Sequence, residues 1–598
     1  MPMPMSARNA SFIQGANRVA QQFEFTKEDV RRTTKLFLEQ MVEGLEQNGA
    51  NISQIPSYVT TLPNGTEKGL CLAVDVGGTN FRVCSVQLHG DRTFSHIQTK
   101  VVIPPELRVS DTAEELFAFF AKQIELFLRT YHSDHLEAHF ASSEAAPSTS
   151  GCTQGFHRLA FTFSHAIDQQ GINKGFLIRW SKGFSIPAAV GRDVCSLLQD
   201  QIKLLNLPVL VTALTNDTVG TLMARAYMSL TETRPILGAV FGTGTNGAYI
   251  EKLENIRKLK LVNTDVQLQD SREMIINTEW GSFDNQLKIL PSTAFDDTLD
   301  INSVNPGYEL FEKRISGMYL GELLRLAILS IIEISPGTDS VISTSTEKHV
   351  FGENYSDSNT MTVEETSPIY TQWGLDTSLL STMAADKSPD LQLIRQELAV
   401  SVGIKNVNIE DAQILKSLAR AISTRAARLA GVAVAAVVIK SECIAPQVAA
   451  QCCEDSSRTK FDLPAFVPGK LIRIIKRWAK KLQRYLRGTK SELKSAALDT
   501  TPPLASNSLL KCQISDRVSS SGTSTGSDVE RAVDIGVDGS LVELHPGFKD
   551  ELRGALRDVE EIGEVGESRI TIGIAKDGGG IGAALVGLLA EQQQQRRF

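Results

Sequence analysis

Two glycine-rich turns in the sequence have the composition of loops that hold phosphate groups. The first is DVGGTNFRV, from Asp75 to Val83, and it joins two short runs of aliphatic and β-branched residues. The second is GTGTNG, from Gly242 to Gly247. Glycine has no Cβ to block a phosphate oxygen, so backbone N–H groups in such turns can reach it. A single GG turn is usually an ordinary β-turn, so the prediction depends on the residues around it.

The glycines at 242–247 also match the pattern of a dinucleotide-binding turn. That turn needs a helix directly after the glycines, because the helix N-terminus faces the pyrophosphate. The residues that follow, AYIEKLE, favour a strand instead. We therefore interpret this segment as a second phosphate hairpin and not as a nicotinamide site.

Asp217 stands where an apolar strand pattern ends and a helical pattern begins, at about Thr218. Asp is a favoured helix-capping residue, which is the simpler interpretation. However, transfer of a phosphoryl group to an alcohol needs a carboxylate that accepts the hydroxyl proton. Both interpretations of Asp217 stay open at this point.

Several other polar residues are suited to a ligand rich in hydroxyl groups. Glu279 and Glu312 stand beside aromatic and glycine residues, where a carboxylate can accept two sugar hydroxyls while a ring shapes the pocket. The segments FTFSH and RWSKGF add Ser164, Ser181 and Lys182. Near the C-terminus, KDGGGIGAALVGLLA is a glycine loop that runs directly into an apolar helix, which suits a phosphate or adenosine at a helix N-terminus.

Taken in chain order, these motifs resemble those of the eukaryotic hexokinase and glucokinase family. The resemblance extends from about residue 20 to residue 595 and rests on DVGGTNFRV, FTFSH, RWSKGF, NDTVGT, FGTGTNGA, NTEWGSFDN, FEKRISGMYLGEL, TRAARLA, VDGS and DGGGIGAA. It implies ATP-dependent phosphorylation of glucose or another hexose at the 6-hydroxyl, the entry step of glycolysis.

The resemblance also implies roles for individual residues, with Asp217 as the catalytic base. The sugar would be bound by Ser164, Ser181, Lys182, Asn216, Asp217, Asn246, Glu279 and Glu312. ATP would be bound by Asp75, Gly77, Gly78, Thr79, Asn80, Arg82, Lys100, Thr221, Gly242, Thr243, Gly244, Gly317, Met318, Thr377, Ser378, Asp538, Gly539 and Ser540. Mg²⁺ would be carried on the nucleotide phosphates and on water, so no residue is assigned as its ligand.

The chain has 598 residues, which favours two lobes with a cleft between them. Helical patterns at 27–47, 111–130, 190–205, 217–229 and 311–333 alternate with strand patterns at 159–164, 208–215 and 236–250, as in an α/β protein. The resemblance implies the two-lobed, actin-like (ribonuclease H-like) fold with an interlobe cleft.

We expect four kinds of segment along the chain. Residues 1–19 would be a flexible N-terminus, 20–67 and 216–575 the large lobe, and 68–215 with 576–598 the small lobe and a terminal helix. Stretches at 141–155, 335–370 and 488–530 are rich in Ser, Thr, Glu and Gly and are expected to be mobile loops. Insertions in the large lobe are expected near 335–370 and 442–530.

Composition limits the partners and the compartment. A formal net charge of -8 gives no reason to expect nucleic acid as the main ligand. Eight cysteines without a CxxC pair suggest reduced thiols, and the longest apolar run, 429–439, is too short to cross a bilayer. The start also lacks the pattern of a signal peptide. We expect a cytosolic protein, with a nuclear or mitochondrial-surface pool as an additional expectation.

The sequence departs from the family at several positions. Gly579 and Ser181 stand where the family has Ser and Thr, LLSTMAADKSP replaces a Tyr-Pro and acidic stretch, and Tyr308 and Glu309 replace two glutamines. Residues 470–490 contain nine Lys or Arg and no acid, and 470–487 predict a basic amphipathic helix for a membrane surface or an acidic protein partner. These departures leave a second hypothesis, a sugar-binding regulator that is catalytically weak or inactive.

Overall fold

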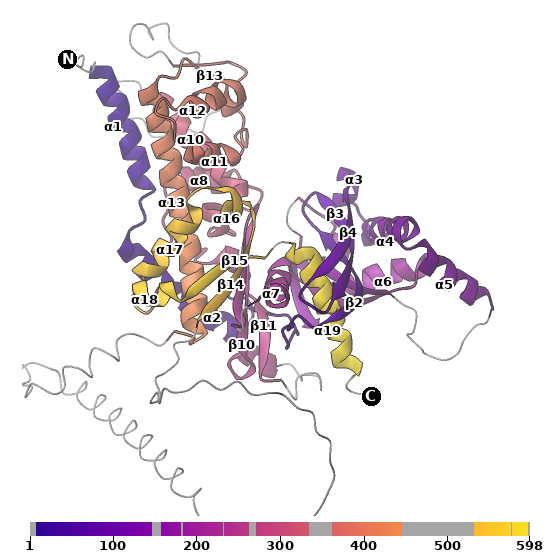
Figure 1. Ribbon diagram of the computed structural model, residues 1–598. Coiled ribbons are helices and arrows are strands. Elements are labelled where there is room, and N and C mark those ends of the chain that lie inside the picture. The colour runs from indigo at the N-terminus through magenta and orange to yellow at the C-terminus, as the bar shows by residue number, and fades with distance from the viewer. Residues whose placement is uncertain are drawn as a thin grey trace, which may run out of the picture. The chain divides into compact units, whose positions relative to one another are not determined.

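The structure is a computed structural model that describes residues 7–145, 157–180, 183–230, 233–261, 271–333, 361–444, 532–575 and 577–595 (Figure 1). Ser181 and Lys182 lie outside the described residues, as do the basic segment 470–487 and most of each expected insertion. Two main sheets, one of five strands and one of six, organise the described part.

The five-stranded sheet has the order β4-β3-β2-β5-β8. Its strands are β2 (Lys68–Val76), β3 (Asn80–His89), β4 (Phe94–Val102), β5 (His157–Phe163) and β8 (Val209–Thr215). The first three form an antiparallel meander, while β5 and β8 run parallel to β2. The hairpin predicted around the first glycine turn is therefore confirmed.

Helices cover both faces of this sheet because its strands carry apolar side chains on both sides. On one face, β2 and β5 pack against α4 (Ala113–Tyr131) and α6 (Val194–Leu204). On the other face, small residues such as Ala73, Ala160 and Ala213 allow α19 (Ala583–Gln595) to lie close to the strands. Chain segments far apart in the sequence thus share one core.

The six-stranded sheet has the order β1-β11-β10-β9-β14-β15. Its strands are β1 (Ile55–Pro56), β9 (Pro235–Phe241), β10 (Thr245–Lys252), β11 (Glu273–Asn277), β14 (Val533–Asp538) and β15 (Ile570–Ile574). The strands β9 and β10 pair antiparallel across the turn at 242–244. Since a strand and not a helix follows these glycines, the structure agrees with the hairpin interpretation.

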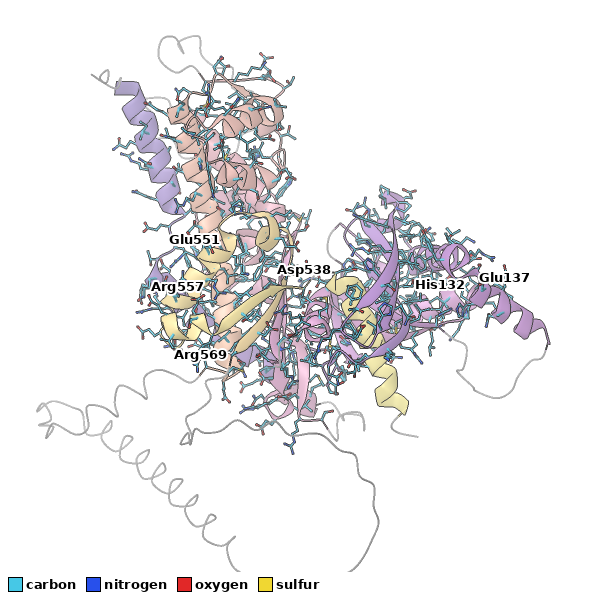
Figure 2. The ribbon with its side chains drawn as sticks, in the orientation of Figure 1. His132, Glu137, Asp538, Glu551, Arg557 and Arg569 are labelled. Carbon is cyan, nitrogen blue, oxygen red and sulfur yellow. The ribbon has the colours of Figure 1, made fainter. Side chains whose placement is uncertain are left out.

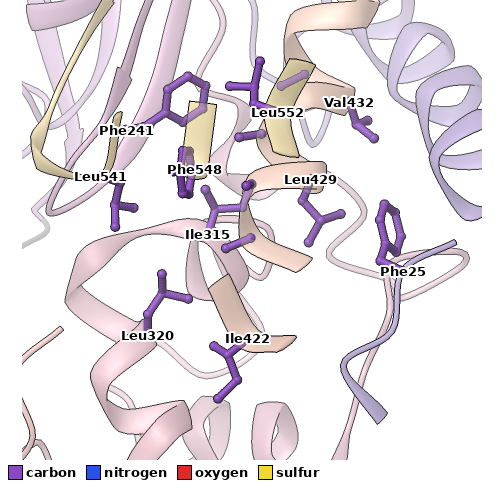
Figure 3. Close-up of a cluster of buried hydrophobic side chains, with 14 of the residues drawn as sticks. Phe25, Phe241, Ile315, Leu320, Ile422, Leu429, Val432, Leu541, Phe548 and Leu552 are labelled. Carbon is purple, nitrogen blue, oxygen red and sulfur yellow. The ribbon is translucent and has the colours of Figure 1, made fainter. Parts of the chain in front are cut away.

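Several helices share one hydrophobic core with the six-stranded sheet. They include α2 (Lys27–Glu46), α10 (Gly317–Glu333), α13 (Ile409–Lys440) and α17 (Phe548–Asp558). Figure 3 shows Phe241 of β9 beside Phe548 and Leu552 of α17, with Leu429 of α13 in the same cluster. By length and composition α13 could cross a membrane, but 83% of its most apolar stretch is buried inside the fold. It is therefore a core helix.

The fold also contains further α-helices and two short ribbons. The helices are α1 (Ala7–Gln22), α3 (Pro105–Arg108), α5 (Ser133–Ala145), α7 (Asp217–Met228), α8 (Ala294–Ile301), α9 (Glu312–Ile315), α11 (Ser378–Ala385), α12 (Gln392–Glu397), α16 (Ser540–Leu544) and α18 (Gly563–Ser568). Two-stranded ribbons are formed by β6 (Ala166–Gly171) with β7 (Lys174–Arg179), and by β12 (Thr362–Val363) with β13 (Ile404–Lys405).

Two expectations about mobile segments are wrong for the described residues. Within 1–19, residues from Ala7 onward form α1, which lies beside α13 (Figure 1) because Ala16 and Val19 are buried against the core. Within 335–370, the described part contains the buried residues Met361 and Ile369. A few apolar residues at suitable spacing are enough to dock these segments. The lobe boundaries themselves stay a prediction.

A buried ion pair joins two of these helices, and a ring just after a third helix lies against it. Arg425 of α13 donates to both carboxylate oxygens of Asp296 in α8, at 2.7 Å each, and the two side chains are 0% and 2% exposed. The guanidinium also lies 4.8 Å from the ring centroid of Phe23, just after α1. Burial alone would raise the pKa of Asp296, but the charge and hydrogen bonds of Arg425 hold that pKa at about 2.

We expect Arg425→Met to destabilise the fold by about 3–5 kcal/mol, because it leaves the Asp296 carboxylate buried without its partner. Urea unfolding measures the free energy. The control Arg257→Met breaks an exposed pair with Glu46 and should cost less than about 1 kcal/mol. The double variant Arg425→Met with Asp296→Leu should be more stable than Arg425→Met alone. If Arg425→Met and Arg257→Met lowered the free energy of unfolding equally, the stabilising role of the Arg425–Asp296 pair would be contradicted.

The Arg425–Asp296 pair makes the free energy of unfolding depend on pH. The folded pKa of Asp296 is about 2, and an unfolded aspartate has a pKa of about 4. The stabilisation is therefore complete above pH about 4 and is lost as the pH falls towards about 2. A wild-type chain should lose more unfolding free energy over this range than Asp296→Asn does.

Candidate active site

The parallel strands β2, β5 and β8 end at one edge of the five-stranded sheet. The pairs Val76 with Phe163 and Thr162 with Thr215 fix this register. Ligand sites in α/β proteins commonly lie beyond the carboxyl ends of parallel strands. Gly77, Ser164 and Asn216, which follow these strands directly, are thus placed along the same edge.

The end of β8 shows which residue of the Asn216–Asp217 pair caps the next helix. Asn216 is the N-cap of α7, since its side chain accepts a hydrogen bond from Thr218 N at 2.9 Å. Asp217 is the first helical residue, is half-buried, and its carboxylate also accepts from Thr218 N at 2.9 Å. Asn216 thus provides the N-cap of α7, and the Asp217 carboxylate stands at the first residue of that helix; its role as a base stays a prediction.

A network of amides and a carboxylate surrounds Asn246 in β10. The Asn246 amide nitrogen donates to Glu279 Oε1 at 3.1 Å, to Asn277 Oδ1 at 2.8 Å and to Asn216 Oδ1 at 3.4 Å. The Asn277 amide also donates to Glu279 Oε1, at 2.7 Å. The network thus connects the N-cap of α7 to the ends of β10 and β11, and it joins three of the predicted sugar-binding residues.

The backbone at Glu279 helps to build this network. Glu279 has a φ of 53°, in the left-handed region that costs free energy for a residue with a side chain, and its N–H donates to Asn246 Oδ1 at 3.0 Å.

Asn277 was not singled out from the sequence, although it opens the NTEWG motif at the end of a strand. A polar residue at that strand end is the signal that could have identified it.

Glu312, at the start of α9, is placed beside the second glycine turn. Its Oε2 accepts a hydrogen bond from Thr245 N at 2.8 Å. A Cβ at Gly244 would lie 2.8 Å from the same oxygen, so a larger residue there would require the Glu312 carboxylate to shift. The indole of the fully buried Trp280 donates to Thr245 Oγ1 at 3.1 Å. The carboxylates of Glu279 and Glu312, both predicted to bind the sugar, therefore flank the start of β10.

The predicted nucleotide-binding residues of the six-stranded sheet also converge. Gly317 N donates to Gly242 O at 2.8 Å and Met318 N donates to Thr243 O at 3.2 Å. The hydroxyl of Thr377 accepts from the N-terminal half of α10, from Gly321 N at 2.9 Å. Ser378 begins α11 directly after it. The turn at 242–244 is thereby fastened to the N-terminus of α10.

The end of β14 lies against this turn. Asp538, labelled in Figure 2, accepts a hydrogen bond from Gly539 N at 2.7 Å, and burial raises its pKa. Gly539 has a φ of 111°, and a Cβ there would lie 2.4 Å from Phe241 O. Only glycine permits this contact, after which Ser540 starts α16.

Charged residues gather at the first glycine turn. Arg82 Nη1 lies 3.2 Å from Asp577 Oδ1 and 4.0 Å from Asp75 Oδ2. Asp75, Arg82 and Lys100 are cross-strand neighbours on β2, β3 and β4, although Lys100 is exposed. Burial raises the pKa of Asp577, and the charge of Arg82 opposes this rise. Asp577 was not assigned from the sequence; its signal was the acid directly before the 578–582 glycines.

The rest of the first turn consists of Gly77, Gly78, Thr79 and Asn80. Gly77 N donates to Asn80 O at 2.9 Å, and Thr79 O accepts from Ile103 N at 2.8 Å. These bonds fold the turn between β2 and β3. At Gly579, a Cβ would lie 3.3 Å from Asp75 Oδ2. The glycine loop at 578–582 therefore lies next to this turn.

The N-terminal half of α7 packs backbone to backbone against the loop at 578–582. A Cβ at Gly220 would lie 2.0 Å from Gly578 O, and one at Gly582 would lie 1.9 Å from Gly220 O. Thr221 touches Gly578 at the same crossing, and its hydroxyl donates to Asp217 O at 2.9 Å. This crossing brings the predicted catalytic carboxylate and the predicted phosphate loops to neighbouring positions.

Comparison with known families and proteins is consistent along almost the entire chain. A family model described as hexokinase matches residues 15–227, and a second model with the same description matches 236–522 and 506–589. The chain is 42% identical to a glucokinase of Aspergillus niger over 589 residues, which cover 98% of this chain and 99% of the relative. It is 34% identical to Glucokinase-1 of Saccharomyces cerevisiae, with 98% of each chain covered.

A solved structure is also similar. A hexokinase from Schistosoma mansoni complexed with glucose superposes with a TM-score of 0.66 at 25% identity, and the match covers 97% of this chain and 99% of that one.

We expect Gly220→Ala to lower turnover at least about tenfold, because its Cβ would push α7, with Asp217, away from Gly578 and small displacements of catalytic groups are costly. The matched control is Gly554→Ala in α17, where the nearest atom would lie at 3.8 Å. That change should stabilise the fold by about 0.5–1 kcal/mol through helix propensity. Activity and thermal unfolding of both variants measure this. A stable, fully active Gly220→Ala would contradict the crossing's role.

Proposed function

The chain belongs to the hexokinase family, and we propose that it transfers the γ-phosphoryl group of ATP to the 6-hydroxyl of glucose or a related hexose. The observation that supports this best is the network of Asn216, Asn246 and Glu279 beside Asp217 at the start of α7. It places sugar-binding groups next to a carboxylate suited to proton transfer.

Hexose recognition follows from the chemistry of this network. Carboxylate oxygens of Glu279 and Glu312 accept hydrogen bonds from sugar hydroxyls, while the amides of Asn216 and Asn246 can both donate and accept. Because these side chains already bond to one another, they are held in place before the sugar arrives, which lowers the entropic cost of binding. Ser164, with Ser181 and Lys182 beyond the described residues, would contact the sugar from the other sheet.

Asp217 acts as the general base in the proposed reaction. Its carboxylate accepts the proton of the 6-hydroxyl as the oxygen attacks the γ-phosphorus. The nucleotide product leaves on the opposite side of the phosphorus, towards the glycine turns. The Asn216 cap and the α7 crossing keep this carboxylate at a fixed position, so little reorganisation is needed.

The residues present fit ATP at the two glycine turns. Backbone N–H groups at 77–80 and 242–244 are suited to phosphate oxygens, and Arg82 adds a positive charge. The segment of Gly317, Met318 and Thr377 would hold the nucleoside. ADP would be released from the same residues.

The donor set also bears on Mg²⁺. Among the described residues no group of three His, Cys, Asp or Glu side chains could hold a metal ion by itself. Mg²⁺ is therefore proposed to enter on the nucleotide, with Asp75 and Asp577 near its waters. When bound, it would neutralise phosphate charge during the transfer.

Water must be kept from competing with the hexose hydroxyl. In the proposed mechanism, sugar binding brings the segments that carry Ser164 and Lys182 onto the network around Asn246 and excludes water. The alternative of a sugar-binding regulator without activity gains no support from the described residues, because the carboxylates and amides of the site are all present. We propose a cytosolic location for the enzyme.

We expect Asp217→Asn to reduce turnover at least about a hundredfold, since the amide cannot accept the hydroxyl proton. Glucose binding should stay within a few-fold of wild type, because the Asn246 network is unchanged. A coupled assay for hexose 6-phosphate measures turnover, and fluorescence of Trp280 and its neighbours measures binding. Asp297→Asn, at an exposed position of α8, serves as the control. Near-normal turnover of Asp217→Asn would refute the assignment, and a wild-type chain that binds glucose without turnover would refute the proposed function.

A further inference from the structure

One side-chain amide joins three elements that lead into the proposed sugar site. Gln169 is half-buried in β6, within the β6–β7 ribbon. Its Nε2 donates to Ser57 O at 3.1 Å, to Gly171 O at 3.1 Å and to Leu214 O at 3.2 Å. The first acceptor directly follows β1, the second ends β6, and the third lies near the end of β8. Because all three acceptors are carbonyl oxygens, it is the NH₂ group of the amide that faces them.

Ser57 is fastened to the edge of the six-stranded sheet. Its N–H and its hydroxyl both donate to Ile275 O, at 3.1 and 2.7 Å. Directly before Ser57, β1 pairs antiparallel with β11, and Ile55 stands opposite Asn277. The strand β11 ends at Asn277, whose side chain donates to Glu279. The amide of β6 is therefore tied, through Ser57, to the strand that leads into Glu279.

The ribbon and β8 lead to other groups of the site. Ser164 lies between the end of β5 and the start of β6, so the path of the ribbon affects its position. Leu214 stands shortly before Asn216, the N-cap of α7. A Cβ at Gly175 of β7 would lie only 2.4 Å from Leu214 Cδ2, and Leu214 N donates to Ile172 O at 2.7 Å. These contacts fasten the ribbon to the end of β8.

The amide nitrogen of Gln169 has fewer hydrogens than acceptors. It carries two hydrogens, while three carbonyl oxygens lie at 3.1 to 3.2 Å. At least one hydrogen is therefore shared between two carbonyls. Sharing lets the bonds redistribute when the three elements shift by small amounts, so the amide can keep them together while a ligand binds.

Resting on the proposed function, we propose that Gln169 is a positioning residue that ties the β6–β7 ribbon and the end of β8 to the segment after β1, and so aligns Ser164 with Glu279 for hexose binding. We call this set of three hydrogen bonds the Gln169 clamp. Its acceptors are main-chain carbonyls, and the α7 crossing holds Asp217 in place without it. The clamp therefore contributes to hexose affinity and not to the chemical step.

Two variants of nearly the same size as glutamine test the clamp. Gln169→Met fills the space without a hydrogen-bond donor, and Gln169→Glu places a carboxylate against three carbonyl oxygens. Gln169→Met should raise both the glucose Kd and the glucose KM about three- to tenfold, an effect of the size that one hydrogen bond supplies. Gln169→Glu should raise both further, because its charge repels the carbonyls. In each variant kcat should stay within about threefold of wild type, since uniform binding is lost and the chemical step is unchanged.

The matched control is Gln170→Met, at the next position of the same ribbon. Gln170 is exposed, and its amide donates to Asp168 Oδ2 at 2.8 Å, a contact within β6 itself. This change should leave the glucose Kd, the glucose KM and kcat within about twofold of wild type. Thermal unfolding of the three variants establishes that each is folded at the temperature of the binding measurement.

The outcomes separate this inference from the proposed function. Glucose Kd, measured by tryptophan fluorescence, tests the clamp without turnover, so a wild-type chain that binds glucose but transfers no phosphoryl group would overturn the proposed function alone. An unchanged glucose Kd in folded Gln169→Met and Gln169→Glu would overturn the clamp, even if both variants unfold at a lower temperature. An equal loss of affinity in Gln170→Met, or a tenfold loss of kcat with unchanged KM in Gln169→Met, would overturn it as well.

Discussion

The crossing of α7 over the glycine segment at 578–582 leaves no space for side chains, and the position of the active site depends on it. Gly220, Gly578 and Gly582 bring two backbones to contact distance, and Gly238 does the same on β9, where a Cβ would lie 2.4 Å from Leu222 N. The helix α7 is thus packed at backbone level against both the six-stranded sheet and the segment that leads into α19. Asp217, in the first turn of α7, is therefore held in a fixed position.

An ion pair secures the other end of α7. Arg225 donates to both oxygens of Asp534 in β14, and the two side chains are 17% and 2% exposed. Space for the arginine is provided by Gly536 and Gly573, since a Cβ at Gly573 would lie 2.3 Å from Arg225 Nη1. Breaking such a buried pair is costly, so the helix cannot slide along its axis without exposing an unpaired charge. Rigid placement of this kind suits a catalytic carboxylate.

Charged pairs in this protein fall into two groups by exposure. Buried pairs such as Arg425 with Asp296 hold helices together and are separated only at high cost. Pairs at the ligand-facing turns, Arg82 with Asp577 and Arg179 with Glu309, are partly exposed. Partly exposed ion pairs contribute little free energy by themselves, so a bound phosphate or a movement induced by the sugar can rearrange them. The division suits a rigid frame that carries an adjustable site.

Local chemistry was enough to predict the hairpins at both glycine turns, the helix that begins at Lys27 and the strand–helix junction at Asn216, because glycine and apolar spacing act over a few neighbouring residues. Longer-range facts were decided by the tertiary structure. Sequence reasoning passed over Asn277 and Asp577, because each is defined by a partner that lies 31 or 495 residues away in the chain. The docking of α1 was not predicted for the same reason, because its few apolar residues become buried only when α1 lies beside α13. The sequence by itself determined which residues could do the chemistry, and only the tertiary structure decided which of them meet, because contact between distant segments depends on packing that no local pattern encodes.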